Sequence, residues 1–399
     1  MLNKNLQVIR LKKNREASVA RHHPWVFSGA IDQIVGDVKS GDFVRVLDNK
    51  NQLLGIGAYS ESSQIRVRIL SFAGEEINTE FFAGRIERAF IKRQHLLSQP
   101  NRTACRLIYG ESDQLPGLIV DKYEGYLVCQ FLFAGLEPWR SEIIPLLAKF
   151  SGCNGIYERS DTTSRDKEGL TQTTGVLWGE APPALIRINE NDMLFDVDVA
   201  TGQKTGFFLD QAENRQYLRK HSADQKVLNC FAYTGGFSVA ALLGGATQVI
   251  SVDSSAPALE LLQSNLNANG LGAANHSTVN GNVFQVLRDY QTSGEHFDIV
   301  VLDPPKFAEN KNQVNKAARA YKDLALQACK VINPGGLLVT FSCSGSIEMN
   351  LFQKITSDAL LDANRQGEIV HYLHQGEDHP IALEFPESQY LKGLACRVN

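Results

Sequence analysis

The sequence predicts an α/β protein whose C-terminal part, from about residue 191 on, folds as a doubly wound sheet. Strand signals at 226–231, 248–253, 297–303 and 336–342 alternate with helix signals, which is the pattern of such a sheet. Short alternating β segments fill the first 75 residues, and a mixed α/β region separates the two parts. With 399 residues the chain exceeds the size of a single core, so we expect domains at 1–75, 76–190 and 191–399.

The first domain is expected to be a small β-barrel with basic surfaces. Strands are predicted at 43–47, 53–59 and 65–70, with a turn at 48–50. The strand 65–70 alternates, which puts Arg66 and Arg68 on one face. A solvated strand face and an RNA-binding face are equally compatible with these two arginines.

The central domain is expected to begin with an amphipathic helix from Thr79. Its apolar stripe contains Phe82, Ile86 and Leu97, and its other side carries the basic residues Arg85, Arg88 and Lys92. A wet basic face is the simplest interpretation of that side. Paired strands near 117–121 and 127–132 and a helix over 137–150 complete this domain.

The helices of the last domain have clear boundary signals. The helix predicted over 255–269 starts at Ser255, a favoured N-cap, and has Pro257 in its first turn. The helix predicted over 313–331 ends at an Asn-Pro-Gly-Gly stop at 333–336.

The bulk composition excludes several classes of protein. The chain has ordinary hydrophobic (43%) and charged (21%) fractions, and its net charge of -4 means that any RNA-binding surface must be local. Seven scattered cysteines without a CxxC pair give no zinc or thioredoxin motif, and we expect no metal. No membrane span or leader is visible, so we expect a cytoplasmic protein with no membrane partner.

A glycine turn and an acidic residue suggest a nucleoside site. The strand 226–231 runs into a turn with Gly235 and Gly236 and then a helix, so backbone N–H groups can approach a ligand. Asp253 ends the next strand, where a carboxylate holds a ribose hydroxyl, or alternatively caps the next helix. The turn matches neither GxGxxG nor a P-loop, so S-adenosylmethionine is the expected cofactor.

Two further strand ends carry candidate chemistry. Asp303 begins an Asp-Pro-Pro-Lys-Phe string at the end of the strand 297–303, where doubly wound proteins bind ligands. The string is similar to the signature of amino-group methyltransferases, although Lys306 replaces the aromatic residue. Cys343 follows the strand 336–342 in a Ser-Gly turn, so we interpret it as functional rather than as a buried structural thiol.

Several strings together resemble one family over nearly the whole chain. They are KTGFFLDQ (204–211), NCFAYTGGF (229–237), DPPKF (303–307), FSCSG (341–345), YLKG (390–393) and RHHPWVFSGA (21–30). They are similar to the bacterial 23S ribosomal RNA cytosine-5 methyltransferases with an N-terminal PUA domain. The resemblance implies a PUA barrel, a central α/β domain and a Rossmann-like methyltransferase domain.

The resemblance also implies roles for individual residues. Cys343, Asp303 and Lys306 are the expected catalytic residues. The expected cofactor-binding residues are Phe231, Tyr233, Thr234, Gly235, Gly236, Asp253, Asn282, Asp303 and Gln211. Lys306 stands where many other RNA cytosine-5 methyltransferases carry a second cysteine, and Asn282 stands where an acidic residue near the adenine is expected. The expected partners are 23S rRNA and, as an open alternative, a second copy of the chain.

The implied mechanism uses the Cys343 thiolate. Its addition to carbon 6 of a cytosine would make carbon 5 nucleophilic, and Asp303 would hold the base edge. The target must be single-stranded or flipped out. Two alternatives remain: an amino-group methyltransferase that uses Asp-Pro-Pro without a covalent step, and a non-catalytic RNA-binding or ribosome-assembly factor.

Overall fold

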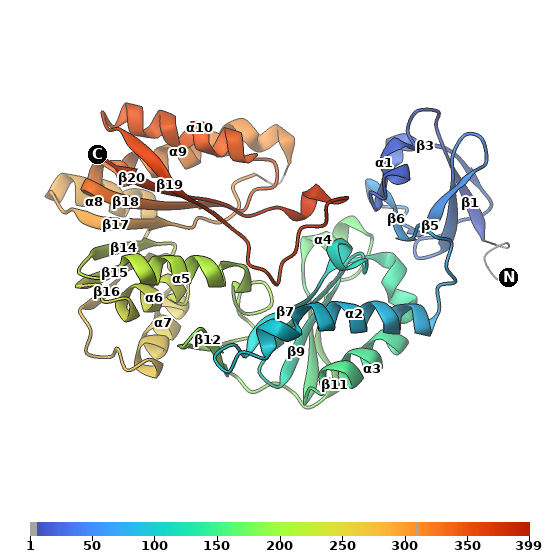
Figure 1. Ribbon diagram of the computed structural model, residues 1–399, viewed down its shortest axis with the longest axis horizontal. Coiled ribbons are helices and arrows are strands. Elements are labelled where there is room, and N and C mark those ends of the chain that lie inside the picture. Colours follow the sequence, from blue (N-terminus) through green and yellow to red (C-terminus); the bar gives the residue numbers. More distant parts are fainter. Residues whose placement is uncertain (1–5, 309) are drawn as a thin grey trace. The chain divides into compact units, whose positions relative to one another are not determined.

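The computed structural model describes residues 6–308 and 310–399 and divides into two compact units (Figure 1). The first unit runs to Ile188 and includes Val197–Leu209 and Asp378–Ser388. The second comprises Asn189–Asp196, Asp210–Glu377 and Gln389–Asn399. No helix in the described ranges is both long and apolar enough to cross a bilayer. The three-domain division at 75/76 and 190/191 stays a prediction.

The N-terminal part of the first unit is a six-stranded sheet in the order β2-β6-β5-β4-β1-β3. Its elements are β1 (Gln7–Leu11), α1 (Ala17–Ala20), β2 (Trp25–Phe27), β3 (Ile31–Val35), β4 (Phe43–Leu47), β5 (Leu53–Tyr59) and β6 (Ile65–Ser71). The three predicted strands, β4 to β6, are confirmed. In β4 the alternate side chains Val44 and Val46 enter one core, which Val67 of β6 joins, whereas β5 is buried along most of its length.

The solvated strand face, one of the two interpretations of Arg66 and Arg68, does not hold for Arg68. Its guanidinium donates to Glu111 (2.7 Å) and to Glu168 (3.0 Å), and its side chain is only 12% exposed. The Arg68 charge is therefore paired with two carboxylates of the protein and does not lie on a solvated face. Period-2 alternation could not reveal this, because both carboxylates come from later parts of the chain.

The central part is a five-stranded sheet in the order β11-β10-β9-β8-β7, against which α2 and α3 pack. Its elements are α2 (Thr79–Leu97), β7 (Ala104–Tyr109), β8 (Leu118–Tyr123), β9 (Tyr126–Phe131), α3 (Arg140–Ser151), β10 (Gly155–Ser160), α4 (Thr163–Lys167) and β11 (Thr173–Gly179). The predicted start of α2 is confirmed, since the Asn78 side chain caps it. The prediction that the basic side of α2 is solvated is wrong at Arg85, which is buried and donates to the Gln114 carbonyl.

The second unit contains a seven-stranded sheet in the order β16-β15-β14-β17-β18-β20-β19. Its strands are β14 (Lys226–Cys230), β15 (Gln248–Asp253), β16 (His276–Asn280), β17 (Phe297–Leu302), β18 (Ile332–Ser342), β19 (Gly367–His374) and β20 (Lys392–Val398). Its helices are α5 (Ala212–His221), α6 (Gly236–Leu243), α7 (Ala256–Ala268), α8 (Val283–Ser293), α9 (Val314–Val331) and α10 (Met349–Asp362). The short hairpin strands β12 (Ile186–Glu190) and β13 (Met193–Val197) precede this sheet.

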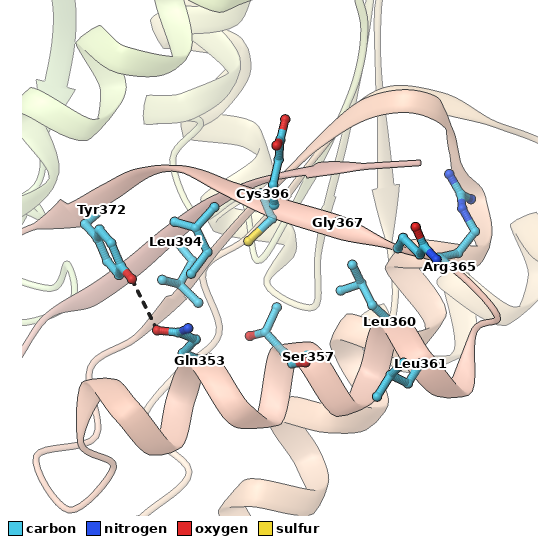
Figure 2. A pocket seen from close by; sticks show the side chains of 13 residues that line it. Gln353, Ser357, Leu360, Leu361, Arg365, Gly367, Tyr372, Leu394 and Cys396 are labelled. Atoms are coloured by element: carbon cyan, nitrogen blue, oxygen red, sulfur yellow. Dashed lines mark hydrogen bonds between the residues drawn. The ribbon is translucent and has the colours of Figure 1, made fainter.

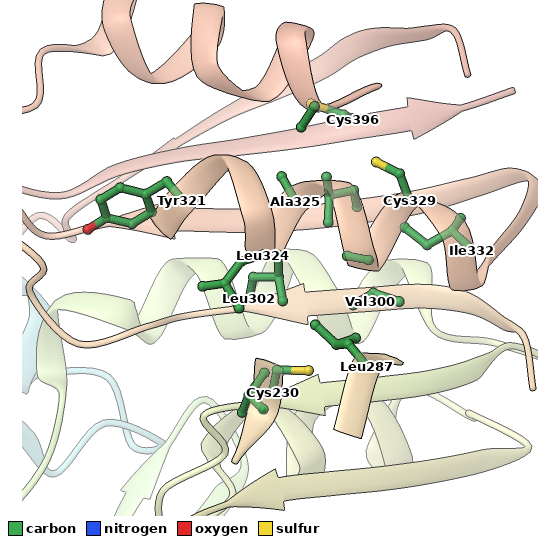
Figure 3. Packing of buried hydrophobic residues seen from close by; sticks show 14 of the residues in the cluster. Cys230, Leu287, Val300, Leu302, Tyr321, Leu324, Ala325, Cys329, Ile332 and Cys396 are labelled. Atoms are coloured by element: carbon green, nitrogen blue, oxygen red, sulfur yellow. The ribbon is translucent and has the colours of Figure 1, made fainter. Parts of the chain in front are cut away.

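Helices cover both faces of this sheet, as a doubly wound fold requires. The helices α8, α9 and α10 cover one face, where Val300 and Leu302 share a core with Leu287 and Leu324 (Figure 3). The helices α5 and α6 pack together on the other side of β14. The predicted parallel strands and the capped helix α7 are confirmed, with Ser255 as the N-cap.

Three strands of this sheet were not predicted, namely β16 at one edge and the pair β20 and β19 at the other. β20 pairs antiparallel with β18, and β19 pairs antiparallel with β20. A strand that returns at the end of the chain has no helix of its own to mark it as part of the alternation. The position of β20 decides which of its residues reach the end of β18.

Candidate active site

Strand register brings the predicted residues to one edge of the sheet. Cys230 of β14 pairs with Val252 of β15 on one side and with Leu302 of β17 on the other. Leu302 in turn pairs with Thr340 of β18. The residues that follow these pairs therefore leave neighbouring parallel strands at their common carboxyl ends, where doubly wound proteins bind ligands.

The turn after β14 has an unusual backbone. Phe231, Tyr233 and Gly235 have φ values of 60°, 48° and 81°, a region that non-glycine residues rarely adopt. Gly235 is required by space as well, since a Cβ there would lie 2.4 Å from the Leu262 side chain. The buried Asn265 donates to the Thr234 carbonyl and holds the turn from below. Strained backbone of this kind is concentrated at ligand sites.

The carboxylate of Asp253 is oriented towards this turn. It accepts hydrogen bonds from the backbone nitrogen of Tyr233 (2.8 Å) and from that of Ser255 (2.8 Å). The cap of α7 is Ser255, so the alternative interpretation of Asp253 as the helix cap is wrong. Each carboxylate oxygen has a second lone pair, and a ribose hydroxyl can donate to it.

Asn282 is the N-cap of α8 and directly follows Gly281, which contacts the backbone of Asp253. Its side-chain oxygen accepts from the backbone nitrogen of Phe284 (2.9 Å) and caps the helix. The preceding Gly281 donates to the carbonyl of Asp253 (3.0 Å), which fixes this loop beside the β15 end. The expected acceptor role of Asn282 towards an adenine would use the second lone pair of that oxygen.

Asp303 is held by two buried amide side chains of the α5 region. The Nε2 of Gln211 donates to Oδ2 of Asp303 (3.0 Å), while its Oε1 accepts from Asn214 (2.6 Å). Asn214 also donates to the carbonyl of His374. Because Asn214 occupies the amide oxygen of Gln211, the Gln211 NH₂ group must face Asp303. Gln211, expected at the cofactor, thus contacts a catalytic candidate.

Cys343 follows β18 and differs from the other six cysteines. It is partly exposed, whereas the others are buried. Burial raises the pKa of Cys329 and Cys396 to about 12, so these thiols stay protonated and inert. The turn that holds Cys343 is tied to the Asp303 loop, since Ser344 Oγ accepts from the backbone nitrogen of Ala308 (3.2 Å) and contacts the Tyr321 hydroxyl.

Lys392 lies in the YLKG string at 390–393, but the sequence alone indicated no role for this lysine. In the register of β18 and β20, Lys392 pairs with Ser342. Its ammonium donates to the carbonyl of Ser344 (2.8 Å), and the side chain is 4% exposed. The predicted Lys306 is exposed in the loop after β17, and its positive charge disfavours the protonated form of Lys392 and lowers the Lys392 pKa. Only the antiparallel pairing of β20 could have identified Lys392.

A large cavity of about 630 Å³ lies elsewhere in the second unit, between α10 and the strands β19 and β20 (Figure 2). It is lined by Leu360, Arg365, Gly367 and Cys396. Gly367 pairs with Val398, which pairs with Gly336 near the start of β18. The lining also includes Tyr372 and Leu394, which pair level with Thr340, so the cavity runs along β20 from the amino end of β18 towards its carboxyl half.

Comparison with known families agrees with this geometry. The model of the S-adenosylmethionine-dependent methyltransferase family matches residues 172–397, and that of the PUA-like domain matches residues 9–72. Fold and site therefore define an S-adenosylmethionine-dependent methyltransferase with an N-terminal PUA-like domain. The predicted fold class and cofactor are confirmed.

Full-length relatives narrow the assignment. The chain is 49% identical over 394 residues to "Ribosomal RNA large subunit methyltransferase I" of Photobacterium profundum, covering 98% of this chain and 99% of the relative. It is 48% identical over 391 residues to the protein of the same name from Tolumonas auensis, covering 98% of each. The chain belongs to the family of ribosomal RNA large subunit methyltransferase I.

Solved structures support the fold. A protein from Streptococcus mutans described as a SAM-dependent methyltransferase has a TM-score of 0.86 at 22% identity, covering 98% of this chain and 99% of its own. A second chain, described as a methyltransferase complexed with SAH, has a TM-score of 0.87 at 23% identity, covering 98% and 99%.

Proposed function

We propose that the protein methylates carbon 5 of a cytosine in 23S rRNA and that Cys343 forms a transient bond to carbon 6 of that base. The observation that carries this proposal is the position of Cys343. Among the seven cysteines it alone is partly exposed, and it leaves β18 beside the loop of Asp303. A structural thiol would be buried like the other six.

The bound S-adenosylmethionine supplies the methyl group. The residues proposed to hold it are the turn from Phe231 to Gly236, the carboxylate of Asp253 and the start of α8 at Asn282. Asp253 suits a ribose, because its oxygens retain lone pairs beside a turn of strained backbone. Gln211 would act on this site through Asp303.

In this proposal Cys343 bonds to the base, and Asp303 orients it. The thiolate would add to carbon 6, and the electron pair of the 5,6 double bond would then bond carbon 5 to the methyl group as its bond to the sulfonium sulfur breaks and S-adenosylhomocysteine leaves. Loss of the carbon-5 proton then restores the double bond as the carbon–sulfur bond breaks. Asp303 would accept hydrogen bonds from the base edge, in an orientation fixed by Gln211. Lys306 would add positive charge at the rim.

The partner of this reaction is RNA. The relatives' name refers to the large subunit, so we propose 23S rRNA as the substrate and the cytoplasm as the location. Cytosine must leave a helix to reach such a site. A second copy of the chain remains the other proposed partner.

The test uses a 23S rRNA fragment that carries 5-fluorocytosine at the target. Fluorine cannot leave as a proton, so a covalent adduct should accumulate and shift the protein on a denaturing gel. The trapped peptide should contain Cys343, and Cys343→Ala should lose both adduct and turnover while it still binds S-adenosylhomocysteine. Cys153→Ala, in the other unit, is the matched control. Methylation of a cytosine amino group by an active Cys343→Ala enzyme would favour the amino-group route, and RNA binding without methylation would favour a non-catalytic factor.

A further inference from the structure

We propose that Lys392 is a positioning residue for Cys343: its buried ammonium stabilises the Cys343 thiolate and fixes the turn that presents the sulfur. This inference rests on the proposed role of Cys343 as a nucleophile. It adds a residue from β20 to a site otherwise built from the ends of parallel strands.

The burial of Lys392 requires an explanation. Its side chain is 4% exposed, and the ammonium has one hydrogen-bond acceptor, the Ser344 carbonyl at 2.8 Å. Within 6–308 and 310–399 no carboxylate forms an ion pair with it, unlike the buried Arg93 and Arg215. A buried, incompletely paired cation costs stability. Such a charge is retained where an anion must form.

The strand register shows where that anion would be. Lys392 pairs with Ser342, the residue immediately before Cys343, and its hydrogen bond reaches Ser344, the residue immediately after it. The ammonium therefore spans the turn at Cys343 from the neighbouring strand. Cys343 is also the group that favours the charged form of Lys392, as expected for a lysine facing a thiolate.

Of the ionisable groups on the elements around this turn that the structure describes, Lys392 is the one that is both buried and positively charged. Lys306 in the loop after β17 is exposed, so water screens it more strongly. Asp303 is in the same loop and is turned towards Gln211. Tyr321 on α9 contacts Ser344, and burial raises its pKa, so it is neutral. Burial lowers the pKa of Lys392 to about 8, which still leaves it mostly protonated at neutral pH.

A thiolate next to lysine has a lowered pKa, whereas a free thiol is only a few per cent ionised at pH 7. The proton of Cys343 leaves to solvent, and Lys392 stays an ammonium throughout. The hydrogen bond to Ser344 adds a second effect, because it holds the turn in one conformation.

The experiment measures the alkylation rate of Cys343 by iodoacetamide against pH in the full-length protein, with the modified peptide quantified by mass spectrometry. Wild type should give a Cys343 pKa below about 7.5, against about 8.5 for a free thiol. A value at or above that of a free thiol overturns the proposal without any variant.

Variants then separate the charge from the hydrogen bond. Lys392→Gln keeps a donor for Ser344 without the charge, and it should cut alkylation at pH 7 several-fold, because the thiolate fraction falls as the thiol pKa rises towards that of a free thiol. Lys392→Arg should restore most of the rate. The matched control is Lys354→Met, an exposed lysine on α10 that should leave the profile unchanged. Binding of S-adenosylhomocysteine shows that each variant is folded.

The outcomes distinguish the two proposals. A Lys392→Gln protein with the wild-type thiol pKa overturns the role of Lys392 and leaves the covalent route standing. An active Cys343→Ala enzyme overturns the covalent route, although the alkylation profile can still show that Lys392 acts on the thiol.

Discussion

The side chain of Gln211 donates a hydrogen bond to Asp303 across 92 positions of sequence, at 3.0 Å. Both partners of Gln211 are fixed, because Asn214 donates to its amide oxygen and leaves the NH₂ group for the carboxylate. One oxygen of Asp303 is thereby committed, and the carboxylate has a defined orientation towards the sheet edge.

Replacing Gln211 by alanine should lower kcat/KM. A hydrogen bond to a charged group is worth about 1.5–3 kcal/mol, so a loss of at least about tenfold is expected. Steady-state methylation of an rRNA fragment measures it. The matched control is Gln216→Ala on α5, the helix that Gln211 precedes; the Gln216 amide donates to the Asn191 carbonyl. Equal rates for both variants would show that the orientation of Asp303 does not matter.

Replacing Asp253 by alanine should weaken S-adenosylhomocysteine binding by at least tenfold. The variant loses the proposed acceptor for the ribose, worth about 1.5–3 kcal/mol, as well as the contact that orients the Tyr233 backbone. Isothermal calorimetry measures the affinity. Asp289→Ala on α8 is the control, since that carboxylate is exposed and contacts Gln285. Unchanged affinity in folded Asp253→Ala would move the ribose site elsewhere.

RNA affinity should depend on exposed basic residues of the N-terminal domain. Deleting the domain would leave Glu111 and Glu168 without their ion-pair partner Arg68. A charge-reversal double variant, Lys13→Glu with Arg21→Glu, is therefore the better test. Each lost phosphate contact should reduce the slope of log K against log salt by about 0.7–0.9. Filter binding over a salt series measures this slope. The control is the double variant Lys149→Glu plus Lys167→Glu, which changes the net charge by the same amount. A slope that falls equally in both variants would exclude a local RNA patch there.

The buried ion pair of Arg93 and Asp113 should be important for the stability of the first unit. Both side chains are at most 2% exposed, and two hydrogen bonds of 2.7 Å join them. Arg93→Met leaves a buried carboxylate and should cost about 3–5 kcal/mol. Lys92→Met is a matched control, because its 55% exposed side chain contacts the same carboxylate and should cost under about 1 kcal/mol.

Urea unfolding followed by tryptophan fluorescence measures this difference. All three tryptophans, Trp25, Trp139 and Trp178, lie in the first unit, so the signal reports on that unit. A loss below 1 kcal/mol for Arg93→Met would mean that Asp113 is protonated or solvated after the substitution.

The sequence by itself determined the elements whose signals are local. The strands β14, β15, β17 and β18 and the capped helix α7 follow from hydrophobic periodicity and from Ser255, because both effects act within one or two turns of chain. Successive parallel strands end at one edge, so the sequence also indicated that Asp303 and Cys343 leave the sheet at the same edge.

Only the tertiary structure decided which distant groups meet. Arg68 is largely enclosed and Arg85 is buried, although a solvated face was one interpretation of each, because their partners Glu111, Glu168 and Gln114 come from other elements. Lys392 reaches the Cys343 turn only through the register of an antiparallel strand at the end of the chain. Such pairings are set by side-chain packing across the whole sheet, and no local sequence window contains both partners.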